Sequence, residues 1–262
     1  MITLHAFGRV NSMVHGLTRD LRVQWALEEL GLPYQVRGVD HSAGETKADA
    51  FLRLSPFHQI PVIEDDGMVL SESGAILVYL AEKAGQLADP QKHAEVLRWC
   101  FAALTTVEPV ISMIVLDDFE QKTDPGSRES RAHLVKFAEQ VLGGVEQHLG
   151  ERAFTADEEF TVADILMVTV LRQARRAGVL AKFPRCEAYW QKCEARPAWG
   201  RTVAAYEKRL GAEPGAVARA VEPTAGPAAI GGAEAAARVR CPSGFRTSVR
   251  WPATRYAELA DS

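Results

Sequence analysis

Two adjacent residues, Glu72 and Ser73, stand where the sequence predicts the start of a helix. The first backbone N–H groups of a helix lack acceptors within it, and the helix dipole adds partial positive charge there, so a carboxylate binds well. The Glu72 carboxylate can in turn hold a cationic amino group. The alternative is that Ser73 is an ordinary N-cap and Glu72 a solvated acid. For Ser73 the two roles are compatible, because its hydroxyl can cap the helix while its N–H binds the carboxylate.

Cysteine and histidine show none of the spacings that metal or redox sites need. The cysteines form no CxxC pair, and the seven histidines form no HExxH and no other cluster with metal-ligand spacing. We therefore expect no bound metal, and reduced thiols as in a cytosolic protein. A Walker-type glycine loop and a GxSxG nucleophile elbow are also missing.

Residues 1–85 alternate segments typical of strands with segments typical of helices. Apolar residues recur at every second position over 2–6, whereas those of 21–30 lie on one side of a helix that Gly31 and Pro33 end. Asp66-Gly67 between two short apolar runs indicates a β-hairpin. The expected elements are a strand at 2–6, a helix at 21–30, a strand at 34–39, a middle helix or loop, a hairpin at 61–70 and a helix from Ser73 to Gly85.

Residues 91–210 show only helical periodicity. The clearest start signal is Thr161 followed three residues later by Asp164, because the two can bond reciprocally as a capping box. Pro109 is expected to bend the first helix of this part. The predicted helices cover 94–119 and 128–149, a third begins at Thr161, and two more cover 184–194 and 197–209.

The composition of the chain is the sum of two different parts. Of the 52 residues from Gly211 to Ser262, 14 are Ala, 6 are Gly and 5 are Pro, and only 10 are larger apolar residues. That number is too small to build a core, so we expect about 210 folded residues followed by a disordered Ala/Gly/Pro-rich tail at 211–262.

Charge and hydropathy disfavour two classes of protein. The chain has 30 Lys and Arg against 34 Asp and Glu, a formal charge of −4, whereas a nucleic-acid binder carries a basic surplus. No apolar run reaches the roughly 18 residues of a membrane span, and the first ten residues do not resemble a secretory signal. We therefore expect a cytoplasmic protein that binds neither nucleic acid nor membrane.

Four segments, in this order and spacing, resemble the glutathione S-transferase family, in its cytosolic, bacterial-like form. They are LRVQWALEELGLPY at 21–34, SPFHQIPVI at 55–63, LSESGAILVYL at 70–80 and TVADI at 161–165. The resemblance covers about residues 1–210. It implies an α/β thioredoxin-like glutathione-binding domain at 1–85, a linker at 86–90, an all-helical domain at 91–210, glutathione as cosubstrate, and a homodimer.

The resemblance also implies which residues hold glutathione. Ile60-Pro61 would form a cis turn whose backbone pairs with the cysteinyl unit like an added strand, although on the pattern alone Pro61 would simply begin an edge strand. Glu72 and Ser73 would take the glutamyl end. Gln59, in place of the Lys common in related sequences, would contact the glutathione backbone or its terminal carboxylate. Lys47, or alternatively Thr46 or His41, would contact the glycyl end.

Catalysis in the family requires the glutathione thiol as thiolate, whereas an ordinary thiol has a pKa near 8.5. Related sequences often place a Ser, Tyr or Cys just after the first strand as the donor to the sulfur. Residues 8–18 offer Asn11, Ser12 and Thr18, and no Tyr or Cys. Ser12 fits best by its distance from the strand, Asn11 lies beside it, and Thr18 fits better as the cap of the next helix.

The resemblance therefore implies a glutathione transferase that activates the thiol for attack on a small apolar electrophile. Trp99, Phe101 and Phe119 are candidates to line the electrophile pocket, although a helix core uses the same residues. One alternative is a binding or dimerisation module of the same fold without catalysis. Another is a glutathione-dependent peroxidase or disulfide reductase, although no Cys stands at the first helix to form a mixed disulfide.

Overall fold

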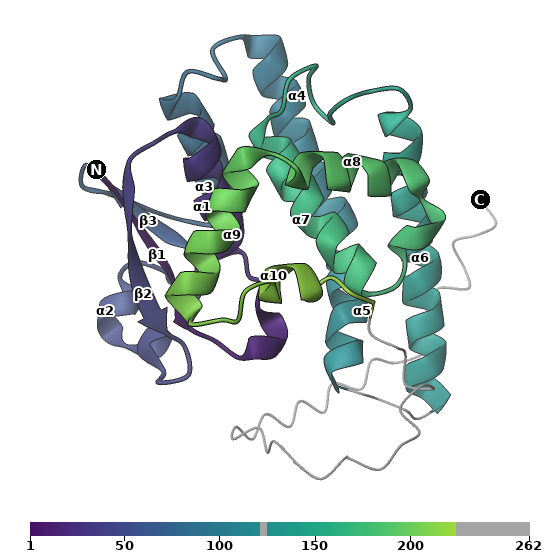
Figure 1. Ribbon diagram of the computed structural model, residues 1–262, viewed down its shortest axis with the longest axis horizontal. Coiled ribbons are helices and arrows are strands. Elements are labelled where there is room, and N and C mark those ends of the chain that lie inside the picture. Colours follow the sequence, from purple (N-terminus) through teal and green to yellow (C-terminus); the bar gives the residue numbers. More distant parts are fainter. Residues whose placement is uncertain (121–124, 224–262) are drawn as a thin grey trace, which may run out of the picture. The chain divides into compact units, whose positions relative to one another are not determined.

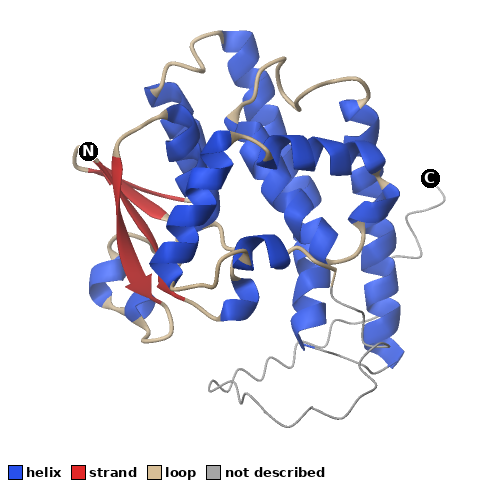
Figure 2. Cartoon of the chain, viewed as in Figure 1, coloured by secondary structure: helices blue, strands red, loops and turns tan. Residues whose placement is uncertain are grey.

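The computed structural model describes residues 1–120 and 125–223. Its N-terminal part is built on a four-stranded sheet in the order β2-β1-β3-β4 (Figures 1 and 2). Strand β1 (Ile2–Arg9) runs parallel to β2 (Tyr34–Asp40) and antiparallel to β3 (Val62–Asp65), which forms a hairpin with β4 (Met68–Ser71). Both turn residues of the hairpin have positive φ, as the Asp-Gly pair indicates.

Helices α1 (Asp20–Leu30) and α3 (Ser73–Lys83) pack on one face of this sheet, and the short helix α2 (Asp49–Leu52) lies on the other side in Figure 1. Gly31 ends α1 in the left-handed conformation, with a φ of 64° that a residue with a side chain rarely adopts. The order β-α-β, then β-β-α, is the thioredoxin-like arrangement, so the fold expected for residues 1–85 is confirmed.

The second part is helical, with α7 at its centre. Every residue of α7 from Val162 to Ala174 is buried, and the helix contacts α1 and α3 of the first part as well as α4, α5 and α8. Its predicted start is confirmed, because the Thr161 N–H donates to the Asp164 carboxylate at 2.8 Å. The helices are α4 (Pro90–Phe101), α5 (Glu108–Glu120), α6 (Pro125–Leu149), α7 (Val162–Arg176), α8 (Pro184–Glu194) and α9 (Pro197–Leu210).

Just before Pro109, where a bend was predicted, the helix contains a π-helical segment, Ala102–Val107, between α4 and α5. Proline has no N–H to donate and its ring collides with the carbonyl four residues earlier, so the helix widens one turn before it. The continuous helix Pro90–Glu120 has the length and hydropathy of a membrane span, but 44% of its most apolar window is buried inside the protein. Because it packs against α6 and α7, we interpret it as a core helix.

The sequence-based boundary after Leu210 is wrong for the first thirteen residues of the expected tail. Residues 211–223 contain the short helix α10 (Ala216–Arg219), and Val217 and Val221 are buried. The Arg172 guanidinium on α7 donates to the Val217 carbonyl at 2.6 Å, and the Glu207 carboxylate accepts from the Val217 N–H at 3.0 Å. A few contacts therefore order a segment whose composition predicted disorder. Residues 224–262 lie outside the described residues.

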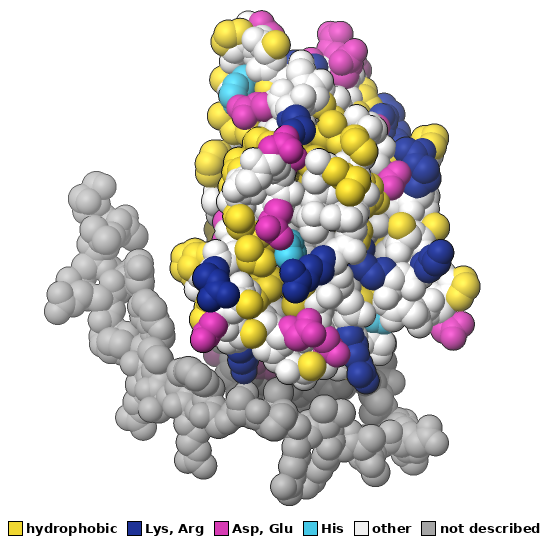
Figure 3. Space-filling model, turned by 90° about the vertical axis from the view of Figure 1, so that its left-hand side faces the viewer, with side chains coloured by type: hydrophobic (Ala, Val, Ile, Leu, Met, Phe, Trp, Pro, Cys, Tyr) yellow, Lys and Arg dark blue, Asp and Glu magenta, His cyan; other side chains and the backbone are white. Residues whose placement is uncertain are grey.

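The surface of the described residues mixes both signs of charge. On the face shown in Figure 3, Lys and Arg side chains lie among Asp and Glu, and hydrophobic side chains gather in its upper half. Several large hydrophobic side chains are exposed, and three of them come from the continuous helix Pro90–Glu120: Phe101, Met113 and Leu116.

Candidate active site

The turn before β3 has the conformation that the resemblance implies. The Ile60–Pro61 peptide bond is cis, and the Ile60 side chain is buried in a small cluster that Phe7 of β1 also contacts. The approach to the turn is held by Ser55, whose hydroxyl accepts from the Gln59 N–H at 3.0 Å. The side chain of Gln59 is exposed, and Ile60 is the last residue before the cis bond.

Lys47 and Gln59 come from neighbouring segments. The His58 ring lies 2.9 Å from the carbonyl oxygen of Thr46, the residue before Lys47. Lys47 is exposed at the end of the 3₁₀ turn Glu45–Lys47, whereas Thr46 is buried. The exposed side chain at 47 is therefore better placed for a solvent-facing ligand than the Thr46 side chain.

The start of α3 differs in detail from the sequence prediction. Glu72, not Ser73, is the N-cap residue, and it has φ 69° and ψ 112°. Non-glycine residues rarely adopt positive φ, and such conformations are often found at functional sites. Ser73 is the first helical residue, and its hydroxyl accepts from Arg22 at 3.4 Å instead of capping the helix.

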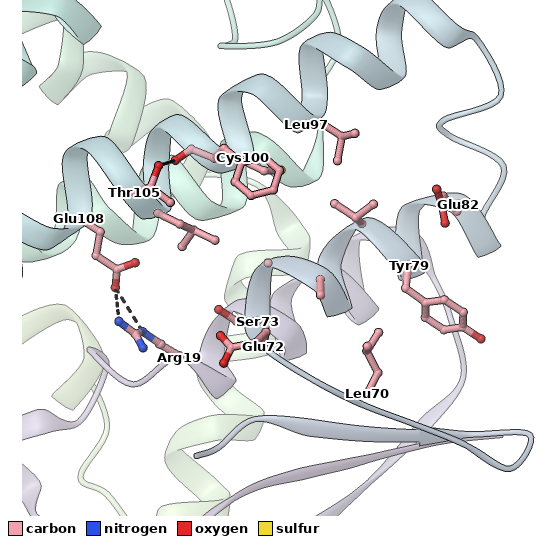
Figure 4. Close-up of a pocket in the computed structure, with 15 residues that line it drawn as sticks. Arg19, Leu70, Glu72, Ser73, Tyr79, Glu82, Leu97, Cys100, Thr105 and Glu108 are labelled. Carbon is pink, nitrogen blue, oxygen red and sulfur yellow. Dashed lines mark hydrogen bonds and ion pairs between the residues drawn. The ribbon is translucent and has the colours of Figure 1, made fainter. Parts of the chain in front are cut away.

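A buried ion pair lies directly behind this helix start. The Arg22 guanidinium donates to both oxygens of Glu108 at 2.9 and 3.1 Å, and its Nε donates to Thr169 at 2.8 Å. Arg19, whose side chain is about half exposed, also donates to Glu108 at 3.2 Å (Figure 4). Burial by itself would raise the pKa of Glu108, but the two arginines outweigh it and hold that pKa below its ordinary value.

This ion pair ties four helices together at the site. Arg22 comes from α1, Ser73 from α3, Glu108 from α5 and Thr169 from α7. We did not predict the pair from the sequence, because each charge sits inside an apolar helical stretch. A charged residue on the apolar face of each of two helices is nevertheless the signal that could have indicated the pair, because a buried charge requires a partner of opposite sign.

The exposed side of the helix start opens into a cavity of about 650 Å³. At one end Arg19, Glu72, Ser73 and Glu108 lie close together, and Figure 4 shows Glu72 and Ser73 beside Arg19. The remainder is lined largely by apolar side chains of β4, α3, α4 and the π-helical segment, namely Leu70, Val78, Leu97, Phe101 and Leu104.

The three candidate donors of the loop after β1 occupy different surroundings. Asn11 caps the 3₁₀ turn Ser12–Val14 by accepting from the Met13 N–H at 2.9 Å. Ser12 lines a separate cavity of about 430 Å³, whose opposite wall is formed by residues of 211–220. None of the three candidates, Thr18 included, lines the cavity that holds Glu72 and Ser73.

Thr18 is not the cap of α1, contrary to the sequence-based expectation. The cap position is Arg19, which makes no side-chain capping bond. The Thr18 hydroxyl lies 2.7 Å from the hydroxyl of Tyr206 on α9. No sequence pattern suggested this pairing, because the two residues are 188 positions apart.

Two contacts locate the N-terminal end of α1, where Thr18 lies. The Asp20 carboxylate accepts from the Phe7 N–H at 3.2 Å, and Phe7 packs against the cluster that contains Ile60. Two residues further along, Arg22 donates to Ser73. Thr18 lies two residues before α1, at the end of the helix whose Asp20 and Arg22 make these two contacts.

A smaller cavity of about 200 Å³ adjoins this end of α1. Leu17 and Arg19, the two neighbours of Thr18, both line it, and Arg19 and Glu108 are shared with the larger cavity. Its other walls are mainly apolar and come from the loop and from α5, with Val14, Val115, Leu116 and Phe119. Of the aromatic candidates, Phe119 therefore lines this cavity, Phe101 lines the larger one, and Trp99 stacks on His148.

Comparison with known proteins matches the chain to two family models. Residues 12–82 match the glutathione S-transferase N-terminal domain, and residues 106–197 match the glutathione S-transferase C-terminal domain. Glutathione S-transferase 3 of Zea mays is 35% identical over 199 residues, which cover 71% of this chain and 88% of that protein. A glutathione S-transferase of Nicotiana tabacum, PARB, is 30% identical over 204 residues, covering 71% and 94%.

Solved structures agree with the sequence comparison. A glutathione transferase from Pseudomonas putida, with glutathione disulfide bound, matches with a TM-score of 0.68 and 26% identity and covers 77% of this chain and 90% of its own. A family member from Pseudomonas fluorescens, with two glutathione molecules bound, matches with a TM-score of 0.67 and 28% identity, covering 77% and 92%.

Proposed function

Because this chain belongs to the glutathione S-transferase family and is a glutathione transferase, we propose that its site comprises the cis turn, the start of α3 and the first residues of α1. The observation that carries the proposal is the convergence of these three segments through the contacts of Phe7 and Arg22. Each segment then takes one part of the tripeptide.

The start of α3 suits the glutamyl end of glutathione. That end carries a carboxylate, which the first N–H groups of the helix attract, and an amino group, which the Glu72 carboxylate holds. The backbone at Ile60 pairs with the cysteinyl unit in the manner of an added strand. Lys47 and Gln59, exposed on neighbouring segments, contact the glycyl carboxylate.

Thr18 takes the catalytic role for which the sequence favoured Ser12. A hydroxyl that donates to the sulfur stabilises the thiolate, and the dipole at the start of a helix adds to the effect. Thr18 lies two residues before α1, at the helix end whose Asp20 and Arg22 contact Phe7 and Ser73, whereas Ser12 lines a cavity formed with residues after α9. Asn11 is engaged in capping its own turn.

The electrophile occupies the small cavity beside Thr18. Its mainly apolar walls suit an apolar molecule, and a volume of about 200 Å³ limits the reactive part to a small group. Leu17 and Arg19, the chain neighbours of Thr18, line this cavity and Thr18 itself does not, so an electrophile there lies beside the residue proposed to hold the sulfur. Much of the rate then comes from bringing the two reactants together.

Burial disfavours disulfide reduction through the thiolates of the three cysteines that the structure describes; Cys241 lies outside the described residues. Cys100, Cys186 and Cys193 are buried, and burial raises the pKa of the Cys100 thiol to about 12. A thiol of that kind is almost entirely protonated at neutral pH and is a poor nucleophile.

A second copy of the chain covers the apolar part of the larger cavity. Phe101 is 63% exposed there, beside Leu97 and Leu104, and exposed apolar patches of this kind mark protein interfaces. Phe101→Glu is therefore expected to shift the protein from dimer to monomer in sedimentation. Phe137→Glu, at an exposed position of α6, is the control, and equal sedimentation of both variants would contradict this interface.

The binding site is tested by calorimetry and by a conjugation assay with a small apolar electrophile. We expect glutathione to bind, and Thr18→Ala to lower the conjugation rate at saturating glutathione by about 10- to 100-fold, as the loss of one donor to a developing anion does. Ser12→Ala is the matched control and is expected to leave the rate unchanged. A loss with Ser12→Ala but not with Thr18→Ala would overturn the assignment.

A further inference from the structure

Tyr206 of α9 reaches into the loop that carries the proposed catalytic residue. Its side chain is fully buried, and its hydroxyl oxygen accepts from the Gly16 N–H at 3.1 Å. The same hydroxyl lies 2.7 Å from the Thr18 hydroxyl. One phenol from the far end of the chain thus contacts two residues of the loop. In Figure 1, the segment between β1 and α1 lies beside α10 and the end of α9.

The direction of the Tyr206–Thr18 hydrogen bond decides where the Thr18 proton points. Each hydroxyl has a single proton, and either one can donate. If Tyr206 donates, the Thr18 proton is free to point at a third atom. If Thr18 donates, its lone pairs face that atom, which is unfavourable when the atom is an anionic sulfur.

The surroundings of Tyr206 favour its role as donor. Its oxygen already accepts from Gly16, and accepting a hydrogen bond strengthens a hydroxyl as a donor. Burial, and the nearby Asp20 carboxylate, raise the pKa of Tyr206, so the phenol keeps its proton. Asp20 is a second acceptor near Thr18: Arg209, at 2.8 Å, and the Phe7 N–H both bind its Oδ2, so its buried Oδ1 competes with the glutathione sulfur for the Thr18 proton.

The same loop is held rigidly from the C-terminal side. The Arg172 guanidinium bridges the Gly16 carbonyl at 3.3 Å and the Val217 carbonyl at 2.6 Å. Gly16 has a φ of 77°, and a Cβ there would lie 3.0 Å from the Val217 backbone. Arg209, one turn after Tyr206, donates to the Phe7 carbonyl at 3.0 Å. Both ends of the loop are therefore fixed relative to α9, which preorganises the contact with Thr18.

We propose that Tyr206 is a positioning residue for the transferase reaction, whose hydroxyl donates to Thr18 Oγ1 and thereby directs the Thr18 proton toward the glutathione sulfur. The inference rests on the proposed role of Thr18. It adds that this role depends on a residue of α9, outside the thioredoxin-like part that holds glutathione.

The test is a titration of the bound glutathione thiol, followed by the ultraviolet absorbance of the thiolate, in the full chain. Tyr206→Phe removes only the hydroxyl, and we expect it to raise the thiol pKa by about 0.5 to 1 unit and to lower kcat about three- to tenfold. Glutathione affinity measured below the thiol pKa should change little. Tyr189→Phe is the matched control, because Tyr189 is also a buried phenol with one strong hydrogen bond, to Asp164 at 2.7 Å.

A double-variant comparison separates positioning from a merely structural role. In a Thr18→Ala background, Tyr206→Phe is expected to raise the thiol pKa no further, whereas Thr18→Ser should retain the response to Tyr206→Phe. An additional rise in the Thr18→Ala background would overturn the proposal. So would a Tyr206→Phe variant that melts at a lower temperature but keeps the wild-type thiol pKa.

Failure of the underlying assignment gives a different result. If Thr18→Ala itself leaves the thiol pKa unchanged, the role proposed for Thr18 is wrong and that of Tyr206 falls with it. If Thr18→Ala raises the thiol pKa and Tyr206→Phe does not, the Thr18 role stands and only the Tyr206 inference is overturned.

Discussion

The ion pair between Arg22 and Glu108 makes a quantitative prediction about stability. Both side chains are nearly fully buried, with exposed fractions of 1% and 3%. Glu108→Gln keeps the shape of the side chain but removes its charge, so the Arg22 guanidinium remains buried without its counter-ion. Removing one partner of a buried pair costs about 3–5 kcal/mol.

The matched control is Glu139→Gln, the same chemical change at a surface pair. Glu139 accepts from Lys182, whose side chain is 69% exposed, and exposed pairs contribute about 0–1 kcal/mol. Urea unfolding at pH 7 should therefore show a loss about 2–5 kcal/mol greater for Glu108→Gln than for Glu139→Gln. For a domain of this size the difference corresponds to a drop in melting temperature of roughly 4–20 °C.

The pH dependence of that loss follows from the direction of the pKa shift. The pKa of Glu108 is held below its ordinary value, so its contribution is fully present above the unfolded-state pKa of about 4.3. It is lost as the pH falls through the lower folded-state pKa. The difference between wild type and Glu108→Gln should hence be constant from pH 7 to about pH 5 and shrink below that. Equal losses for the two glutamine variants, or a difference that grows in acid, would refute this reasoning.

Three further predictions concern the site and the C-terminal segment. Glu72→Ala should weaken glutathione binding in calorimetry without a matching loss of kcat at saturation. Glu82→Ala, in the same cavity, should leave glutathione binding unchanged, and equal affinities of the two variants would contradict the glutamyl site. Gly16→Ala should lower both melting temperature and kcat more than Gly31→Ala. Both glycines have positive φ, but only a Cβ at position 16 would meet another segment, at 3.0 Å. A larger drop in melting temperature for Gly31→Ala would contradict the packing of Gly16 against Val217. A chain that ends after Leu210 should melt several degrees below a chain that ends after Pro223, because only the shorter chain loses the hydrogen bonds of Val217 to Arg172 and Glu207. Identical melting curves of the two chains would contradict a stabilising role of these bonds.

The sequence predicted the fold well because its signals were local. The Asp66-Gly67 turn, the Gly31 end of α1 and the Thr161–Asp164 capping box depend on a few neighbouring residues, and each occurs where expected. Pro109 marked an irregular helix for the same reason.

For the proposed site, the contacts that the sequence did not indicate join residues far apart in the chain. The cis turn at Ile60–Pro61 followed from the resemblance, but the Thr18–Tyr206 contact spans 188 residues and the Arg22–Glu108 pair spans 86. Composition likewise concealed the order of residues 211–223, because two buried valines and one arginine on α7 suffice to hold that segment. Distance from β1 favoured Ser12, whereas packing places Thr18 at the start of α1.

The most direct test of the proposed site is a crystal structure of the protein with glutathione bound. The account predicts that the glutathione sulfur lies within hydrogen-bond distance of Thr18 Oγ1, with the cysteinyl backbone paired to Ile60 and the glutamyl carboxylate at the Ser73 N–H. A sulfur beside Ser12 or Asn11 instead, with Thr18 turned away, would contradict it.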